Sequence, residues 1–269
     1  MKTRANGIEV NYELHGKEGA PWLVLGHSLA CSVRMWDPQI AALKDGYRIL
    51  AYDTRGHGAS EATKGAYTLE LLADDLFFLL RELKIEKAHY CGLSLGGMIG
   101  QTFALKYPGV LRTLALADTT SRYPEGAASL WAERIRTAQA KGMEPLAQPT
   151  LERWFTEPFR NHNAAAVDAV RKLILATPAA GYIGCSHAIP KINLSARLKE
   201  IKCPILVIVG EQDPGTPPAM AREIHDNAPG SKLVVLPQAA HLANVEQPDL
   251  FNRALMEHLA APTNSEAAA

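Results

Sequence analysis

The chain has 269 residues, a length that suits one α/β domain carrying an insertion. Its 47% apolar and 21% charged residues are typical of a globular protein with a sizeable core, and no apolar stretch approaches the roughly 20 residues of a membrane-spanning helix. Lys plus Arg and Asp plus Glu number 28 each, without a basic stripe, so we expect neither a nucleic-acid nor a membrane partner.

Alternating strands and helices are predicted over most of the chain. Asn6-Gly7 is a strong hairpin signal followed by alternating apolar residues, which predicts an antiparallel edge hairpin. Leucines at helical spacing between Thr68 and Lys84 predict a helix. Further apolar runs predict strands at 22–26, 47–52, 88–92, 111–117, 204–209 and 232–236. Such runs, separated by helices, favour an α/β fold with a mostly parallel, doubly wound sheet covered on both faces.

The alternation stops between Asp118 and Ile201, where we find no convincing strand. Helical stretches are predicted instead near 127–141, 144–156, 163–176 and 179–189. We therefore interpret residues 121–190 as a helical cap, inserted into a core made of residues 1–120 and 191–269.

A Gly-x-Ser-x-Gly motif at residues 92–96 carries the chemistry. It follows an apolar strand and precedes a helix-like run at 98–107, which is the context of a nucleophile elbow. Ser94 is thus the predicted nucleophile. Free N–H groups at a helix start stabilise an oxyanion. By position we assign this role to the amides of Leu95 and of Leu29, the latter in the loop after the first central strand.

A serine hydroxyl needs a general base, and in this motif's usual chain order the acid and then the histidine follow the serine. His241 comes directly after the last predicted strand, whereas His225 and His258 lie in helix-like runs where packed or solvated roles are expected. Asp213, in a loop after a strand, is the predicted acid that orients the imidazole. Asp118 ends an earlier strand and is the alternative; otherwise it is expected to cap a helix or bond a loop.

These motifs, with the Tyr-Asp-Thr-Arg-Gly-His-Gly run at 52–58, resemble the α/β-hydrolase superfamily. We expect the 52–58 run to fix a loop. Other stretches are similar, more narrowly, to the 3-oxoadipate enol-lactonases, which open an enol-lactone in aromatic catabolism. They are residues 35–39, 91–94, 131–135, 142–143, 152–155, 181–185, 213–217 and 240–248. The similarity extends into the predicted cap, where members with different substrates diverge.

The resemblance implies an α/β-hydrolase fold and a serine esterase or lactonase that forms an acyl-enzyme, with 3-oxoadipate enol-lactone as the expected substrate. A lactone with a carboxylate side chain needs a cation in its pocket, since an unpaired buried charge is costly. Arg134 follows Trp131 by about one helical turn, so both are placed to face the substrate. Trp154, Tyr182 and Ile183 are candidate wall residues. An exposed Arg134 and purely packed aromatic residues are the alternatives.

Two other functions stay open. One is a carboxylesterase or acyl-homoserine-lactone lactonase of broader specificity. It is favoured by two departures from the enol-lactonase pattern, His27-Ser28 in the oxyanion loop and His187 in the cap. The other is a catalytically silent ligand receptor on the same fold, against which the complete set of triad candidates argues.

We predict no cofactor and no metal, because the nine histidines lack metal-ligand spacing and the four cysteines form no Cys-x-x-Cys pair. The cysteines are expected to be reduced thiols of a cytoplasmic protein, since no apolar run follows the charged N-terminus. The expected partner is a small-molecule ester or lactone. The sequence leaves a homo-oligomer open.

Overall fold

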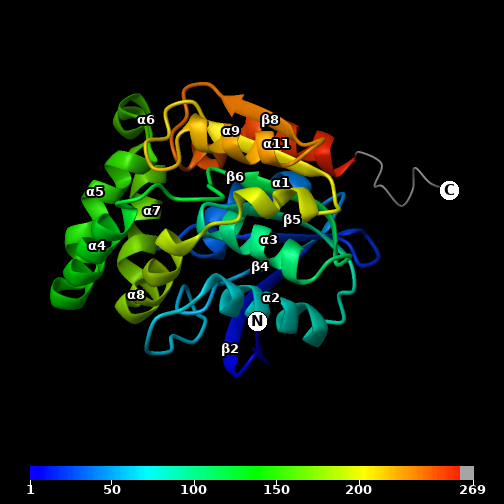
Figure 1. Cartoon of the computed structure of the whole chain (residues 1–269), viewed down its shortest axis with the longest axis horizontal. Helices are drawn as coiled ribbons and strands as arrows, with labels where there is room; N and C mark the ends of the chain where they lie inside the picture. Colours follow the sequence, from blue (N-terminus) through cyan, green and yellow to red (C-terminus); the bar gives the residue numbers. More distant parts are fainter. Residues whose placement is uncertain (261–269) are drawn as a thin grey trace.

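The strands form one mostly parallel sheet in the computed structural model, which describes residues 1–260 (Figure 1). Within these residues the strand order is β1-β2-β4-β3-β5-β6-β7-β8. The bounds are β1 Lys2–Ala5, β2 Ile8–His15, β3 Trp22–Gly26, β4 Arg48–Tyr52, β5 Ala88–Leu93, β6 Leu111–Ala117, β7 Ile205–Gly210 and β8 Lys232–Leu236. Strands β1 and β2 are antiparallel to their neighbours, and all later pairs are parallel. The predicted sheet is confirmed, with each of the six later strands placed to within one residue at either end.

The predicted N-terminal hairpin is also present. Asn6 and Gly7 both have positive φ, 47° and 80°, which is the conformation of the tight two-residue turn whose twist matches that of the strands. Ala5 pairs with Ile8 across this turn. The sequence signal was sufficient here because the turn chemistry is local.

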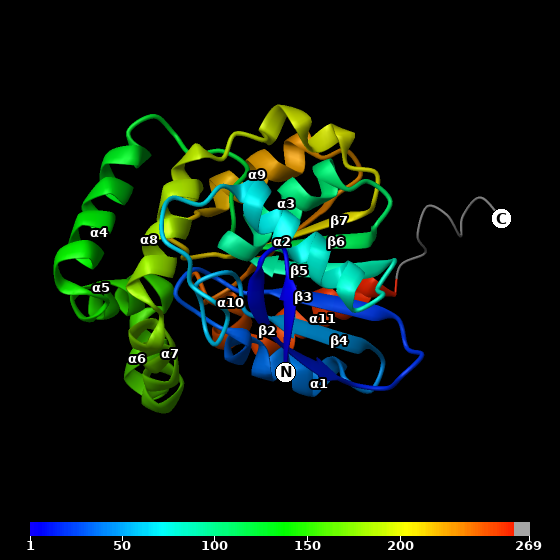
Figure 2. The ribbon, with the colours of Figure 1, turned by 90° about the horizontal axis from the view of Figure 1, so that it is seen from below.

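Helices cover both faces of the sheet (Figure 2). Their bounds are η1 Val33–Trp36, α1 Asp37–Leu43, α2 Leu69–Glu82, α3 Leu95–Lys106, η3 Ser195–Glu200, α9 Pro218–Asn227, α10 Ala243–Glu246 and α11 Pro248–Leu259. Helices α2, α3 and α9 pack on one face, and α1 and α11 on the other. The predicted leucine-rich helix is α2, which begins where the Thr68 hydroxyl accepts a hydrogen bond from the Leu71 amide (3.1 Å).

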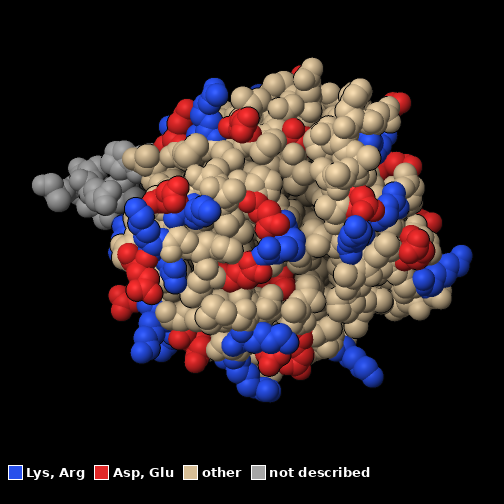
Figure 3. All heavy atoms as spheres, turned by 180° about the vertical axis from the view of Figure 1, so that it is seen from behind, with Lys and Arg blue, Asp and Glu red and all other residues tan. Residues whose placement is uncertain are grey.

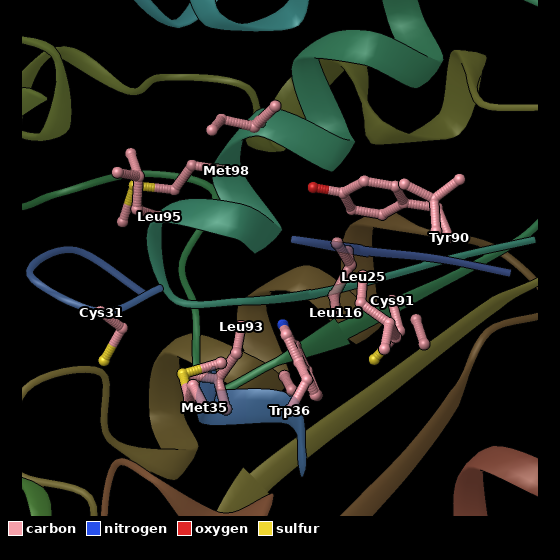
Figure 4. Close-up of a cluster of buried hydrophobic side chains, with 14 of the residues drawn as sticks. Leu25, Cys31, Met35, Trp36, Tyr90, Cys91, Leu93, Leu95, Met98 and Leu116 are labelled. Atoms are coloured by element: carbon pink, nitrogen blue, oxygen red, sulfur yellow. The ribbon is translucent and has the colours of Figure 1, made fainter. Parts of the chain in front are cut away.

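The centre of the sheet is a tightly packed apolar layer (Figure 4). Leu25, Cys91 and Leu116 come from three neighbouring strands and are fully buried. On the α3 side, the Tyr90 hydroxyl points at the helix and donates a hydrogen bond to the Gly96 carbonyl (2.8 Å). Burying each such side chain is worth about 1.5–3 kcal/mol, so the junction of β5 with α3 rests on a rigid base.

Five further helices lie between β6 and β7 and gather at one end of the molecule (Figures 1 and 2). They are α4 Ala127–Lys141, α5 Glu144–Trp154, α6 Glu157–His162, α7 Ala164–Ala176 and α8 Ala179–Ala188, followed by η2 Ile189–Lys191. Four of them match predicted helices. Helix α6 was missed because none of its residues is buried, so that it has no apolar periodicity to detect.

The 52–58 run meets α8 by backbone contact between two glycines. A Cβ atom on Gly181 would overlap the carbonyl oxygen of Gly56, whose own φ is +75°. We expect Gly181→Ala to lower the free energy of unfolding by about 1–3 kcal/mol, the usual cost of overpacking. Gly46→Ala is the matched control, since its Cβ would meet its nearest neighbour at 3.9 Å, and it should change stability by less than about 0.5 kcal/mol. Denaturant unfolding measures both, and equal midpoints would contradict the prediction.

Candidate active site

Ser94 stands at a sharp turn between β5 and α3. Its φ of 55° and ψ of −113° lie outside the regions that side-chain-bearing residues ordinarily adopt. Glycines surround it because there is no room for side chains: a Cβ on Gly92 would overlap the Gly96 carbonyl, and one on Gly96 the Gly26 carbonyl. The Gly-x-Ser-x-Gly motif thus forms the strained strand-to-helix turn that the sequence predicted.

His241 lies in the loop between β8 and α10 and lines the same cavity as Ser94. Its Nδ1 is 2.8 Å from Oδ2 of Asp213, which follows β7. Both side chains are buried, at 5% and 2% exposure. The Trp154 ring packs against the imidazole, with 5.9 Å between ring centroids. Residues from three separate stretches of the chain therefore meet at the carboxyl end of the sheet.

Asp213 is held as a carboxylate by its surroundings. Its Oδ1 accepts the amides of Gly215 (2.8 Å) and Thr216 (3.1 Å), and its Oδ2 accepts the Thr216 hydroxyl (2.7 Å). Burial raises the pKa of Asp213, but the charge of His241 and the hydrogen bonds from His241 and Thr216 outweigh it and leave the pKa below its ordinary value. An ionised carboxylate only accepts, so Nδ1 of His241 carries the proton and Nε2 is free to act as a base.

Asp118, the alternative acid, forms no hydrogen bond or ion pair with His241. It ends β6 with a φ of 43°, is fully buried, and its Oδ1 accepts the Gly210 amide (2.7 Å) at the end of β7. Burial, and then the charge of Asp213, raise its pKa well above the ordinary value. Asp118 thus makes the loop hydrogen bond expected of it if it is not the acid. It supports the strand that leads into Asp213.

The other two histidines considered as bases lie in helices. Nδ1 of His225, in α9, is 2.8 Å from the Ser231 hydroxyl. His258 is buried in α11, where desolvation lowers its pKa to about 4. Neither lines the Ser94 cavity.

The cavity has a volume of about 180 Å³ and lies between the sheet and the helices that follow β6. Residues from α4, α5, α7 and α8 make its outer wall, and they include Trp131, Arg134, Arg153, Trp154 and Tyr182. Ile183 and His187 do not line it. Successive residues of a helix turn by about 100°, so a helix that presents Tyr182 to the cavity turns Ile183 away.

Two arginines in this wall have no carboxylate partner within residues 1–260. The Arg134 guanidinium lies 4.6 Å from the Trp131 ring centroid. Among the described residues, the Arg153 side chain donates only to the Thr150 hydroxyl (3.3 Å), and burial together with the charge of Arg134 lowers its pKa. Sequence reasoning missed Arg153. The available signal was its position in the sequence. Arg153 directly precedes Trp154, a predicted wall residue, and follows Thr150 by about one helical turn.

Leu29 lines the cavity in the loop after β3, and its amide is unoccupied. Neither this N–H nor that of Leu95 donates a hydrogen bond to another residue within 1–260. The loop is shaped by His27, whose Nδ1–H donates to the Ser28 carbonyl (2.7 Å) while Nε2 accepts the Thr54 amide (2.9 Å). Both amides predicted to bind the oxyanion therefore lack a hydrogen-bond acceptor within residues 1–260, and their role stays a prediction.

The 52–58 run holds the loop after β3 in place through hydrogen bonds. Asp53 accepts the amides of Val33 (2.8 Å) and Ala59 (2.9 Å), and Arg55 forms a buried ion pair with Asp75 (2.6 Å). As expected, these side chains hold loops in place and do not line the cavity.

Residues 21–248 match a family profile described as alpha/beta hydrolase fold. The chain belongs to the α/β-hydrolase family. This hydrolase is 36% identical over 251 residues to a 3-oxoadipate enol-lactonase of Acinetobacter baylyi, with 93% of each chain covered. It superposes with a TM-score of 0.94 and 36% identity on an enol-lactonase of Burkholderia xenovorans, covering 97% of this chain and 100% of that one. The predicted fold, family and enzyme class are confirmed.

A third similar protein is a thermophilic esterase of Thermogutta terrifontis, solved with malate bound. It superposes with a TM-score of 0.90 at 30% identity, covering 96% of this chain and 98% of that one. This hydrolase therefore has relatives named as lactonases and as esterases. The size of its cavity suits a small molecule.

The remaining expectations concern surface and ions. None of the helices within residues 1–260 is long and apolar enough to cross a membrane. On the face seen in Figure 3, acidic and basic side chains are interspersed. No group of three or more potential metal ligands occurs in the described part of the chain. The absence of a metal and of a cofactor remains a prediction.

Proposed function

We propose that Ser94, His241 and Asp213 are the catalytic triad of a carboxylic ester hydrolase that opens 3-oxoadipate enol-lactone. The observation that carries this proposal is the buried Asp213–His241 pair, of which His241 lines the same cavity as Ser94, and this cavity contains unpaired arginines. The substrate follows from that positive charge and from the likeness to the enol-lactonases.

The reaction proceeds in two acyl-transfer steps. Nε2 of His241 takes the hydroxyl proton of Ser94 as the serine oxygen attacks the lactone carbonyl, and the amides of Leu29 and Leu95 stabilise the oxyanion. The ring C–O bond then breaks, and the leaving oxygen departs as an enol, protonated by His241. Water attacks the resulting acyl-enzyme with His241 again as base, which releases the dicarboxylate product and free Ser94.

Arg134 and Arg153 bind the carboxylate that the substrate already carries. Two cations close together in a partly apolar cavity repel one another, and burial opposes their charge. An anionic group between them relieves both effects. The malate, a dicarboxylate, in the structure of the similar esterase is consistent with such a ligand.

Helices α4–α8 act as a cap on the rest of the chain. In this proposal the cap comprises residues 121–190, and the core comprises residues 1–120 and 191–269. Residues 261–269 lie outside the described part of the chain. The proposal is supported by the cavity wall, since each of the two arginines comes from this helical segment while the triad comes from the sheet loops.

Measuring kcat/KM on three substrates tests the substrate. They are 3-oxoadipate enol-lactone, p-nitrophenyl acetate and an acyl-homoserine lactone. We expect the enol-lactone to be preferred. Arg134→Leu and Arg153→Leu should each lower its kcat/KM by about 10–100-fold, because a hydrogen bond to a charged group contributes about 1.5–3 kcal/mol. Turnover of the neutral ester should stay within about threefold of the wild type.

Arg136→Leu is the matched control. Arg136 is an exposed arginine in α4, the helix of Arg134, and it does not line the cavity. It should leave all three substrates unaffected. A preference for a neutral substrate that neither Leu variant alters would discard the enol-lactone. The second candidate function, a broad-specificity esterase, would then replace it. The similarity to the Thermogutta esterase favours this candidate.

We also propose a cytoplasmic location. All four cysteines lie within residues 1–260 and are unpaired, which suits a reducing compartment. A homo-oligomer stays open.

A further inference from the structure

Glu246 joins the helical cap to the loop that carries His241. This carboxylate, at the end of α10, is only 7% exposed. One oxygen, Oε1, accepts both the amide (2.9 Å) and the hydroxyl (2.8 Å) of Thr156, between α5 and α6. The other, Oε2, accepts the amide of Ala240 (2.5 Å), the residue before His241. One buried side chain thus spans two segments that are far apart in the sequence.

A second hydrogen bond connects the same two segments on the other side of His241. The amide of Leu242 donates to the carbonyl of Trp154 (3.1 Å). The residues before and after His241 are therefore both bonded to the 154–156 segment, one directly and one through Glu246. The Trp154 ring, tilted by 31° to the imidazole, adds a third contact from that segment.

Burial raises the pKa of Glu246, whereas its hydrogen bonds favour the carboxylate. Three donors converge on its two oxygens, an arrangement that only an acceptor without protons satisfies at both ends. A glutamine would turn its NH₂ group toward an N–H or O–H donor at one end and lose the bond there. A buried acid that served packing alone would be costly.

We propose that Glu246 is a positioning residue for the reaction. Asp213 orients the imidazole of His241, and Glu246 fixes its backbone relative to the cap, so that Nε2 stands where it can take the proton of Ser94. Arg153 and Trp154 line the cavity in the same helix that ends before Thr156. The base is therefore aligned with the segment that contacts the substrate. The inference rests on the proposed triad.

Two reagents that carry no carboxylate for the arginines to bind test this proposal. The measurements are the turnover of p-nitrophenyl acetate and the rate at which a fluorophosphonate labels Ser94. For Glu246→Gln we expect kcat and the labelling rate to fall about 10–100-fold, since a displacement of about 1 Å can cost a hundredfold. KM should stay within about threefold, because no substrate contact is lost. Glu223→Gln is the control. That carboxylate also accepts two side-chain donors, Arg122 (3.0 Å) and Ser195 (2.8 Å), without lining the cavity.

Thr156 provides a milder second test if Glu246→Gln folds poorly. Thr156→Val removes one of the three hydrogen bonds and should lower kcat about 3–10-fold, whereas Thr156→Ser keeps the hydroxyl and should restore it. Thr156 also caps α6, and Thr68→Val, at the start of α2, controls for a lost helix cap.

Wild-type kcat and labelling in Glu246→Gln, even with a lower melting temperature, would overturn the positioning role alone. Equal losses in Thr156→Ser and Thr156→Val would also overturn it, because the hydroxyl would then have no part. A wild-type protein that reacts with neither reagent would overturn the triad, and the role of Glu246 with it.

Discussion

Replacing Ser94 with alanine is expected to lower kcat by about 10⁴–10⁶-fold, because the members of a catalytic triad act as a unit and the oxyanion amides alone retain only residual activity. The backbone of Ser94 is strained, and alanine adopts positive φ about as readily as serine does. The turn should therefore persist when the hydroxyl is removed. Steady-state turnover of the enol-lactone measures the loss. Ser121→Ala, at a buried serine outside the cavity, should stay within about threefold of the wild type.

Fluorophosphonate labelling of the same variant separates an enzyme from a receptor. The wild type should be labelled at Ser94, and Ser94→Ala should not. A wild type that binds small carboxylates but is neither labelled nor active would favour the silent receptor. Near wild-type turnover by Ser94→Ala would contradict the mechanism, because the mechanism uses Ser94 as the nucleophile for which His241 is the base.

The second large effect is expected at the acid. Asp213→Asn should lower kcat by about 10³–10⁴-fold, as the loss of a triad carboxylate does in serine proteases, because the amide no longer holds the proton on Nδ1 of His241. Asp118→Asn should cost less than about tenfold. Its asparagine oxygen can still accept the Gly210 amide, and burial already favours the uncharged form of Asp118, whose raised pKa reflects this.

Turnover of p-nitrophenyl acetate by the two variants, with melting curves for each, distinguishes the two aspartates. Both replace a buried carboxyl group by an amide, so each is the other's control for lost stability. A larger loss of kcat in Asp118→Asn than in Asp213→Asn would reverse the assignment of the acid. A loss in both that follows the melting temperatures would point to folding and away from catalysis.

Much of this hydrolase could be predicted from local pattern. Continuous apolar runs located β3 to β8. In β3 to β7 the reason is that strands covered on both faces have few polar positions, whereas β8 lies at the edge of the sheet and is only partly buried. The turns at Asn6-Gly7 and at Ser94 were predictable for a related reason. A backbone with positive φ, or one packed against another backbone, admits few residue types.

The choice between Asp213 and Asp118 shows where local pattern stops. Each follows a buried strand, and β6 and β7 are neighbours, so both carboxyl groups reach the same edge of the sheet. The loop geometry after β7 brings Asp213 to His241, and no residue spacing encodes that distance. The sequence ranked Asp213 before Asp118 by position, and the hydrogen bond to His241 that supports this order is visible only in the folded chain.

The sequence by itself determined the family and the type of sheet, and it predicted the nucleophile and the order of its partners, because each depends on periodicity or on a short motif. Only the tertiary structure decided which side chains complete the site. Arg153 and Glu246 lie in unremarkable helical contexts, and their roles depend on an unpaired charge in a cavity and on donors 90 residues away. Burial of charge and convergence of hydrogen bonds are properties of packed groups, and residues distant in sequence acquire them only when the cap helices meet the loops of the sheet.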